Sequence, residues 1–199
     1  MAFTEPRVLL VINLLLATLF IGSCVQKPEK PHLRSYNIDS LELKNVNGAF
    51  YVGSDRFSGL LYALNPEGDS VFSRCYIGGL EDGIQKKWYS NGMLEEIRQY
   101  TMGKKTGINK GFWPNGSKRY IYHFINDLNE GVQYEWYSND TLYSKKNYSA
   151  GYESGLQQSW NLDGAVKSNY EARNGRNYGY IGKKNCNSVW KDATFVSMH

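Results

Sequence analysis

The sequence predicts an all-β fold: an elongated antiparallel meander of stacked β-hairpin repeats, with a cap at each end. Composition is the first indication, since aromatic residues make up 15 % of the 199 residues, with 16 Tyr and 8 Phe, and Gly occurs 20 times. Such a composition favours strands and turns over helices. Turn signals at intervals of roughly 12 residues and a longer repeat are the second and third indications.

The repeat has a period of 24 residues, carried by six glycines in register: Gly59, Gly83, Gly107, Gly131, Gly155 and Gly179. An aliphatic residue follows each of the first five. Two aromatic columns share the period, and we interpret them as the repeat core: Trp88, Phe112, Trp136 and Trp160, then Tyr100, Phe124 and Tyr148. A single hairpin could not fold alone, but stacked neighbours can share such a face.

A turn pair divides each unit into two strands: Glu67-Gly68, Asn91-Gly92, Asn115-Gly116, Asn139-Asp140 and Asp163-Gly164. Asn and Gly accept the positive φ that type I′ hairpin turns require. Each unit is therefore predicted to be one antiparallel hairpin. A second turn, such as Met102 to Lys105, leads into the next unit.

Alternation along the strands assigns the two faces of the sheet. Ile84 and Trp88 share one parity, and with Tyr100 we assign them to the packed face. The opposite parity carries a polar ladder that we expect to face water: Gln85, Asn109, Gln133 and Gln157. One-sided burial of this kind is typical of antiparallel sheets.

The segment from Gly83 to Leu94, with Tyr100 and Gly103-Lys104, resembles the MORN-repeat variant, G-x-x-x-x-W-Y-x-N-G-x-L followed by an aromatic and a Gly-Lys turn. The units that begin at residues 107, 131 and 155 resemble it more loosely. The resemblance covers residues 57–179 and implies a twisted sheet of stacked hairpins. Bacterial members are often labelled antitoxin components or membrane-binding proteins, but a repeat is a scaffold and does not fix function.

The N-terminus reads as an export signal. Val8 to Ile21 is an apolar core of about 14 residues, too short to span a bilayer comfortably, which disfavours a retained transmembrane anchor. Ile21-Gly22-Ser23-Cys24 resembles a lipobox, which implies cleavage before Cys24 and lipidation of its thiol. We expect a cell-envelope lipoprotein, and Val25 favours the outer membrane over the inner one.

The domain organisation follows from these segments. We expect a lipoprotein signal peptide at 1–23, the lipidated cysteine and an extended tether at 24–40, an N-terminal strand cap at 41–58, the repeat array at 59–179 and a C-terminal cap at 180–199. Cys75 and Cys186 lie at opposite ends of the array, roughly 40 Å apart at the strand spacing. We therefore expect no disulfide between them, because a bridge needs Cα atoms within about 7 Å.

Charge and motif content exclude several function classes. The net charge is +4, but the basic residues occur in dispersed pairs, so we expect no nucleic-acid binding. The histidines His32, His123 and His199 lack metal-ligand spacing. No nucleophile elbow or phosphate loop is present. We predict no metal, no cofactor and no enzymatic activity.

The remaining interpretation is a binding scaffold. We expect Tyr89, Trp113 and Tyr137 to form an exposed aromatic row on the face opposite Trp88, where they would bind an envelope protein or a glycan. One alternative is lipid contact by the repeats through Lys86, Lys104, Lys105, Lys145 and Lys146. An antitoxin or immunity function is a second alternative, by resemblance only.

Overall fold

The structure, a computed structural model, describes residues 33–182. The predictions for the signal peptide, for Cys24 and for residues 183–199, including Cys186, lie outside the described residues. Within 33–182 the chain is almost entirely β-structure, with one short 3₁₀ helix, η1 (Ile38–Ser40), which confirms the all-β prediction. No helix in this part of the chain is long and apolar enough to cross a bilayer.

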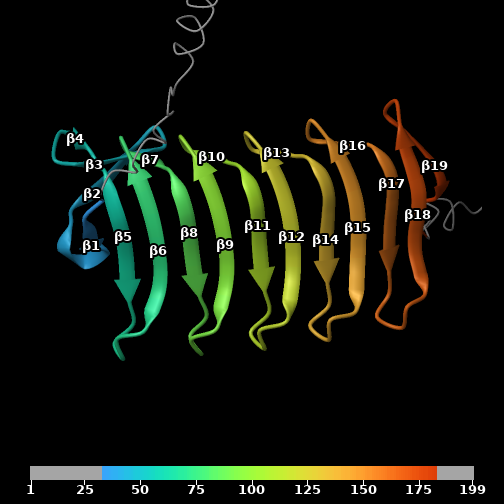
Figure 1. Cartoon of the computed structure of the whole chain (residues 1–199), viewed down its shortest axis with the longest axis horizontal. Coiled ribbons are helices and arrows are strands. Elements are labelled where there is room, and N and C mark those ends of the chain that lie inside the picture. The colour runs from blue at the N-terminus through green and yellow to red at the C-terminus, as the bar shows by residue number, and fades with distance from the viewer. Residues whose placement is uncertain (1–32, 183–199) are drawn as a thin grey trace, which may run out of the picture. The chain divides into compact units, whose positions relative to one another are not determined.

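Five hairpins stand side by side in one long antiparallel sheet (Figure 1). They are β5 (Gly59–Leu64) with β6 (Ser70–Ile77), β8 (Gly83–Trp88) with β9 (Leu94–Thr101), β11 (Gly107–Phe112) with β12 (Lys118–Ile125), β14 (Gly131–Trp136) with β15 (Leu142–Ser149), and β17 (Gly155–Trp160) with β18 (Val166–Arg173). Strand β19 (Arg176–Tyr180) pairs with β18 at one edge of this sheet. The architecture is thus the predicted meander of stacked hairpins.

Tight linking turns connect one hairpin to the next through short strands: β7 (Leu80–Glu81), β10 (Lys104–Lys105), β13 (Leu128–Asn129) and β16 (Tyr152–Glu153). Both central residues of each linking turn have positive φ, as in Met102 (49°) and Gly103 (79°). This is the type I′ geometry, whose twist matches that of the flanking strands. The second, third and fourth of these turns each donate to the short strand before them, as when the Gly103 N–H donates to the Glu81 carbonyl of β7 at 2.7 Å.

The loops at the other end of the hairpins are not the predicted type I′ turns. In the loop after β8, Gly92 has positive φ (79°) but Asn91 does not. The Gly92 N–H donates to the Tyr89 carbonyl (3.0 Å), and the Tyr89 N–H donates to the Met93 carbonyl (2.8 Å). These contacts indicate a type I turn followed by one left-handed residue. The type I′ prediction is wrong because Asn91 stabilises the loop through its side chain and not through a positive φ. Its Oδ1 accepts a hydrogen bond from the Met93 N–H at 3.1 Å.

A separate small sheet precedes the array. It comprises β2 (Leu43–Val46), β3 (Ala49–Val52) and β4 (Asp55–Arg56), while β1 (Ser35–Asn37) pairs in parallel with β5. The main hydrophobic cluster lies where this segment meets the first hairpin. Its buried members are Phe57, Leu61 and Tyr76, with seven partly buried residues packed around them: Tyr36, Ile38, Leu41, Leu43, Phe50, Val52 and Phe72. The segment therefore covers part of one face of β5 and β6.

A β-bulge recurs at the same position in all five hairpins and controls which side chains share a face. In the second hairpin Lys87 pairs with Glu96 but Trp88 pairs with Leu94, so the return strand carries one extra residue. Beyond the bulge the alternation is displaced by one residue. Tyr100 therefore lies opposite Gly83 and shares a face with Gln85, whereas Ile84 lies opposite Gln99 on the other face.

We name the two faces by their dominant residues. The tyrosine face carries the four amides of the ladder and, opposite them, Arg98, Tyr122, Lys146 and Tyr170. The lysine face carries the aliphatic residue after each repeat glycine and the residues Lys86, Lys110 and Lys145. The predicted polarity of the faces is wrong. Gln85, Asn109, Gln133 and Gln157 are at most 6 % exposed, while Ile84, Ile108 and Leu156 are 45–56 % exposed.

The buried amides replace backbone hydrogen bonds between neighbouring hairpins. Strands β12 and β14 pair at only two positions, Tyr120 with Glu135 and Ile121 with Tyr134, before they diverge. In the gap, the Gln133 side chain accepts from the His123 N–H (2.8 Å) and donates to the His123 carbonyl (2.9 Å). Gln157 binds Asn147 in the same way. A ladder of amides inside the sheet is thus structural.

Candidate binding surfaces

Tyrosine hydroxyls on the tyrosine face are tied to carboxylates of neighbouring hairpins. Tyr120 Oη donates to Glu96 Oε2 at 3.0 Å, across to the preceding hairpin. Tyr170 Oη donates to Glu153 Oε2 at 2.7 Å. Tyr122 Oη donates to Glu135, which also accepts from Ser144 Oγ at 2.9 Å. The three tyrosine bonds join neighbouring units and hold them in register, whereas the Ser144 bond lies within the fourth hairpin.

Cations complete this network and keep the carboxylates paired. Arg98 lies 2.7 Å from Glu96, and Lys146 lies 3.2 Å from Glu153. Burial and the adjacent Glu96 raise the pKa of Tyr120 from 10.0 to about 12. Burial and the hydrogen bond to Glu135 likewise raise the pKa of Tyr122. Tyr120 and Tyr122 are therefore protonated hydrogen-bond donors at neutral pH.

The three aromatics predicted as a binding row, Tyr89, Trp113 and Tyr137, connect successive hairpins. Their polar ends donate to backbone carbonyls of the next hairpin: Tyr89 Oη to Phe112 (2.9 Å), Trp113 Nε1 to Trp136 (3.1 Å) and Tyr137 Oη to Trp160 (3.1 Å). All three are half-buried, so the expected openly exposed row is wrong. Their predicted role in binding stays a prediction, but each has a structural role as well.

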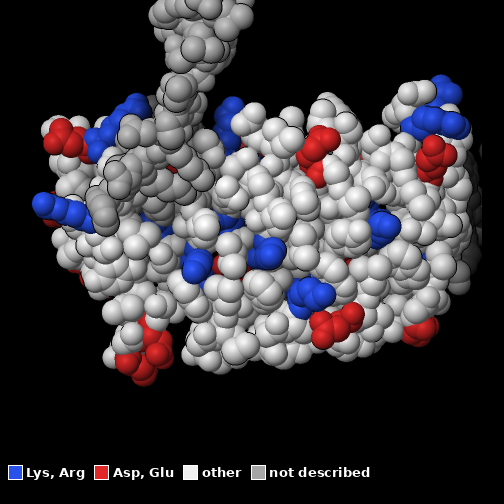
Figure 2. Space-filling view, in the orientation of Figure 1, with Lys and Arg blue, Asp and Glu red and all other residues white. Residues whose placement is uncertain are grey.

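The lysine face is the more open of the two. Ile84, Ile108 and Leu156 form an exposed row at the repeat spacing, and Lys86 and Lys110 are exposed beside it. Among strand residues of the described hairpins, Glu171 is the one carboxylate on this face outside the bulges, against Glu81, Glu96, Glu135 and Glu153 on the tyrosine face. Figure 2 shows isolated basic groups on a largely uncharged surface over β8 to β15.

The aromatic column of the repeats lies on the lysine face and is half-buried at all four positions, Trp88, Phe112, Trp136 and Trp160. Trp136 stacks on Tyr134 with ring centroids 5.6 Å apart, and Lys118 Nζ lies 5.2 Å from the Trp136 ring. The closing column faces the other way, with Tyr100 buried and Phe124 and Tyr148 half-buried. The predicted core residues are therefore divided between the two faces.

The five lysines considered for lipid contact do not share one surface. Lys86 and Lys145 are on the lysine face, and Lys104 pairs with Thr101 on the same side. Lys105 and Lys146 are on the tyrosine face, where Lys146 pairs with Glu153. Any lipid contact by the repeats would therefore use the lysines of the lysine face, which are Lys86, Lys104, Lys110 and Lys145.

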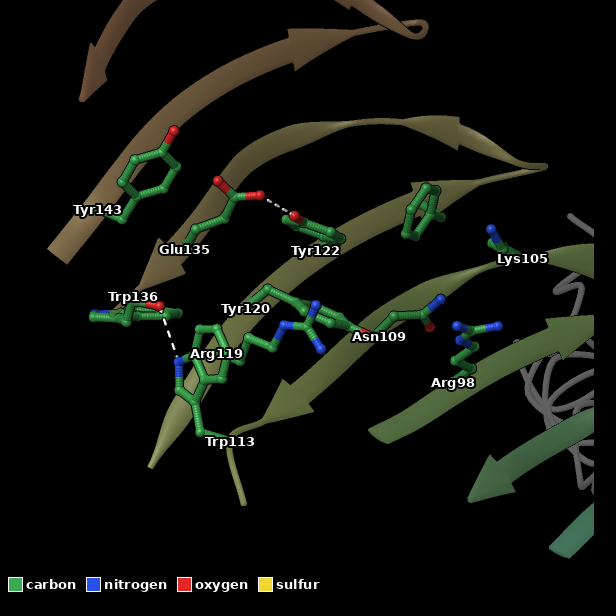
Figure 3. Close-up of a pocket in the computed structure, with 11 residues that line it drawn as sticks. Arg98, Lys105, Asn109, Trp113, Arg119, Tyr120, Tyr122, Glu135, Trp136 and Tyr143 are labelled. Atoms are coloured by element: carbon green, nitrogen blue, oxygen red, sulfur yellow. Dashed lines mark hydrogen bonds between the residues drawn. The ribbon is translucent and has the colours of Figure 1, made fainter. Parts of the chain in front are cut away.

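A hollow of about 470 Å³ lies over β9 to β15 on the tyrosine face (Figure 3). Tyr120 and Tyr122 are at its centre, with ring centroids 4.5 Å apart and planes within 18° of parallel. The other lining residues are Arg98, Lys105, Asn109, Trp113, Arg119, Phe124, Glu135, Trp136 and Tyr143. Aromatic rings, cations and an amide thus surround one concave space, a composition suited to binding.

No further chemistry emerges from the part of the chain that the structure describes. No group of three or more His, Cys, Asp or Glu in residues 33–182 could hold a metal ion. His123 is exposed on the lysine face, opposite Ile108. Because Cys186 lies outside the described residues, the predicted absence of a bond to Cys75 stays a prediction.

Sequence reasoning missed the hollow, although one signal was present. On the first strand of each hairpin, the position two residues after the buried amide or its equivalent is Ala63, Lys87, Gly111, Glu135 or Ser159. Gly111 alone lacks a side chain, and it lies directly opposite Tyr120. A Cβ at Gly111 would lie 2.1 Å from the Tyr120 ring, so this glycine is what allows the ring to lie against the strand.

Comparison with known families identifies the repeat. Three consecutive segments, residues 81–101, 105–126 and 129–150, match the family described as MORN repeat variant. They correspond to the second, third and fourth hairpins of the array. A comparison with curated proteins finds no match.

Proposed function

Because its central hairpins are MORN-variant repeats, we propose that this chain is a lipid-anchored, non-catalytic scaffold of the cell envelope that binds an envelope protein or a glycan through the array. The lipobox-like segment that ends at Cys24 supports the anchor. Repeat arrays of this kind offer an extended surface at little cost in chain length, which favours a scaffold.

The exposure of the lysine face carries the proposal. An aliphatic row that is 45–56 % exposed at Ile84, Ile108 and Leu156 is a surface that folded proteins usually cover. Lysines flank the row, and among the strand residues of the five described hairpins Glu171 is the one carboxylate on this face outside the bulges. A partner protein that presents apolar groups ringed by acidic residues would complement it.

The state of the carboxylates supports a non-catalytic role. General acid–base work needs a carboxyl group free to exchange a proton with a substrate. On the tyrosine face Glu96, Glu135 and Glu153 are each held by a tyrosine hydroxyl and by a second partner. They serve as acceptors between hairpins.

A crosslinked pull-down from the native envelope tests the proposal. The tagged full chain is compared with Cys24→Ala and with a lysine-face variant, Lys86→Glu, Lys110→Glu and Lys145→Glu together. A matched variant reverses three exposed charges in the segment before the array, Arg34→Glu, Lys44→Glu and Arg56→Glu. We expect one enriched partner that is lost in the first two and kept in the matched variant. Equal recovery of that partner with all variants would refute binding through the lysine face.

Direct contact with lipid is a second candidate, favoured by the same lysines together with Trp136 on the lysine face. Vesicles with and without anionic lipid test it, using Cys24→Ala so that the acyl anchor does not contribute. Binding to anionic vesicles should fall steeply with salt and with the lysine-face substitutions. The absence of binding would leave the protein partner as the supported function. The antitoxin hypothesis rests on resemblance alone.

A further inference from the structure

The hollow on the tyrosine face marks the place where the array departs from its own repeat. The column that includes Tyr122 contains a cation in three of the four other hairpins, Arg74, Arg98 and Lys146. In the third hairpin Tyr122 replaces the cation, and Gly111 replaces a residue with a side chain. The third hairpin is therefore the one of the five with two rings at these positions, because the first has Phe72 beside Arg74 and the fifth has Tyr170 beside Ser168.

Two cations at the hollow form no ion pair within the described residues. Lys105 Nζ lies 5.5 Å from the centre of the Phe124 ring, and the Arg119 guanidinium lies 5.0 Å from the centre of the Trp113 ring. Neither forms an ion pair with any residue in 33–182, whereas Arg98 is paired with Glu96. Both positive groups thus retain hydrogen-bonding capacity toward an anion.

The aromatic and polar groups of the lining match a sugar. Half-buried Tyr and Trp rings offer flat apolar surfaces with hydroxyls at their edges, on which the C–H face of a pyranose can rest. Asn109 lies at one side of the hollow and Glu135 at the other (Figure 3). The volume of about 470 Å³ falls within the usual range of small-ligand sites, roughly 300–1,000 Å³.

We propose that the hollow bounded by Trp113, Tyr120 and Tyr122 binds an acidic saccharide, whose ring lies on the aromatic side chains and whose carboxylate pairs with Arg119 or Lys105. A neutral sugar would leave these cations without a partner, and an anion without a ring would not use the stacked tyrosines. This inference rests on the proposed binding function and specifies the class of glycan that the array would bind. It uses the face opposite the proposed protein-binding surface, so the two can fail separately.

Calorimetric titration of the purified full chain with tetragalacturonate tests this inference, with cellotetraose as the neutral analogue and sodium acetate as the anion without a ring. We expect saturable binding of tetragalacturonate and at least tenfold weaker binding of the other two. Arg119→Gln should weaken the binding at least tenfold. The matched control is Arg173→Gln, because Arg173 lies 5.1 Å from the Tyr178 ring in a similar contact outside the hollow.

Three results would overturn the inference: no saturable binding of tetragalacturonate, equal binding of cellotetraose, or equal weakening by Arg119→Gln and Arg173→Gln. Circular dichroism of each variant checks that it is folded, and Lys105→Gln replaces Arg119→Gln if the latter is not. Capture of the envelope partner in the same preparation shows whether the proposed scaffold function still holds. A preparation that captures the partner but binds no saccharide rejects the hollow alone.

Discussion

The two faces of the sheet are made by the same five hairpins, yet they use their side chains in opposite ways. On the tyrosine face, amides and hydroxyls are buried and bonded to the neighbouring hairpin, as Gln133 is to His123. On the lysine face, Ile84 and Ile108 are about half exposed, and Lys110 makes no ion pair within residues 33–182.

This contrast shows how a single layer of strands can be stable without a second sheet. Large side chains on the tyrosine face form hydrogen bonds with each other, and so give the sheet contacts that a second sheet would otherwise provide. The lysine face has no such network, and its apolar row remains available to a partner. Stability and recognition are therefore assigned to different faces, and the following substitutions test that assignment.

The largest expected effect comes from removing a buried amide. Gln133→Ala leaves the His123 N–H without its partner inside the sheet, and the His123 carbonyl then accepts only from the Glu130 N–H. We expect the free energy of unfolding to fall by about 2–4 kcal/mol, since an unsatisfied buried group costs roughly 1–3 kcal/mol and the lost bond to the carbonyl adds about 1 kcal/mol. Urea unfolding followed by tryptophan fluorescence measures this change.

The control is Gln158→Ala, an amide on the lysine face one residue after buried Gln157. It should change the free energy of unfolding by less than about 0.5 kcal/mol. Equal losses at the two positions would contradict the division between the faces.

An alkaline pH dependence should distinguish the faces next. The pKa of Tyr120 is about 12 in the folded chain and 10.0 ordinarily, so between these values the unfolded chain has released a proton that the folded chain retains. The contribution of Tyr120 to the free energy of unfolding is therefore fully present below pH 10.0 and is lost as pH rises toward about 12. Unfolding curves across this range should fall less steeply for Tyr120→Phe than for wild type. The lysine-face variant Tyr134→Phe should follow the wild type, and a shallower curve for it as well would refute the assignment.

A smaller loss is expected from the links between hairpin ends. Tyr137→Phe removes the hydroxyl that donates to the Trp160 carbonyl at 3.1 Å. The expected loss is about 1 kcal/mol, the usual net value of one such bond. Thermal unfolding of this variant beside Tyr134→Phe isolates the hydroxyl, because both changes remove the same atom. If both variants unfold at the wild-type temperature, the bond does not contribute.

The smallest effect, a gain, is expected at Asp140. It has a φ of 63° at the loop position where Gly92 has 79°. Glycine accepts this conformation without strain, although it gives the unfolded chain more freedom. We expect Asp140→Gly to stabilise the chain by about 0.5 kcal/mol, measured by urea unfolding. A loss above about 1 kcal/mol would show that the Asp140 side chain has a role of its own.

The fold could be predicted from the sequence because its signals are local. The glycine period and the turn pairs each act within a few residues, so the hairpins and their number were readable. The assignment of faces was not, because one extra residue between Glu96 and Leu94 reverses the alternation. The residue type of Glu95 does not indicate a bulge. The position of the bulge depends on the register between the two strands, which the sequence does not show.

The candidate site was less predictable for a related reason. The sequence predicts Tyr89 and Tyr137 as exposed aromatics, but their hydroxyls donate to carbonyls 23 residues ahead. Such contacts depend on the distance between stacked hairpins. Gly111 stands out in the sequence once the repeats are aligned, yet its meaning comes from Tyr120 lying opposite it.

The central claim is that the lysine face is the surface that a partner covers, and labelling a cysteine on it tests this most directly. Ile108→Cys places a thiol in the exposed row, and Met102→Cys places one in a linking turn where Met102 is 72 % exposed. Both variants carry Cys75→Ser and Cys186→Ser so that the introduced cysteine alone reports the labelling. We predict that a thiol reagent labels both in purified protein, but labels only Met102→Cys in the intact envelope. Equal labelling of Ile108→Cys in the two preparations would contradict the account.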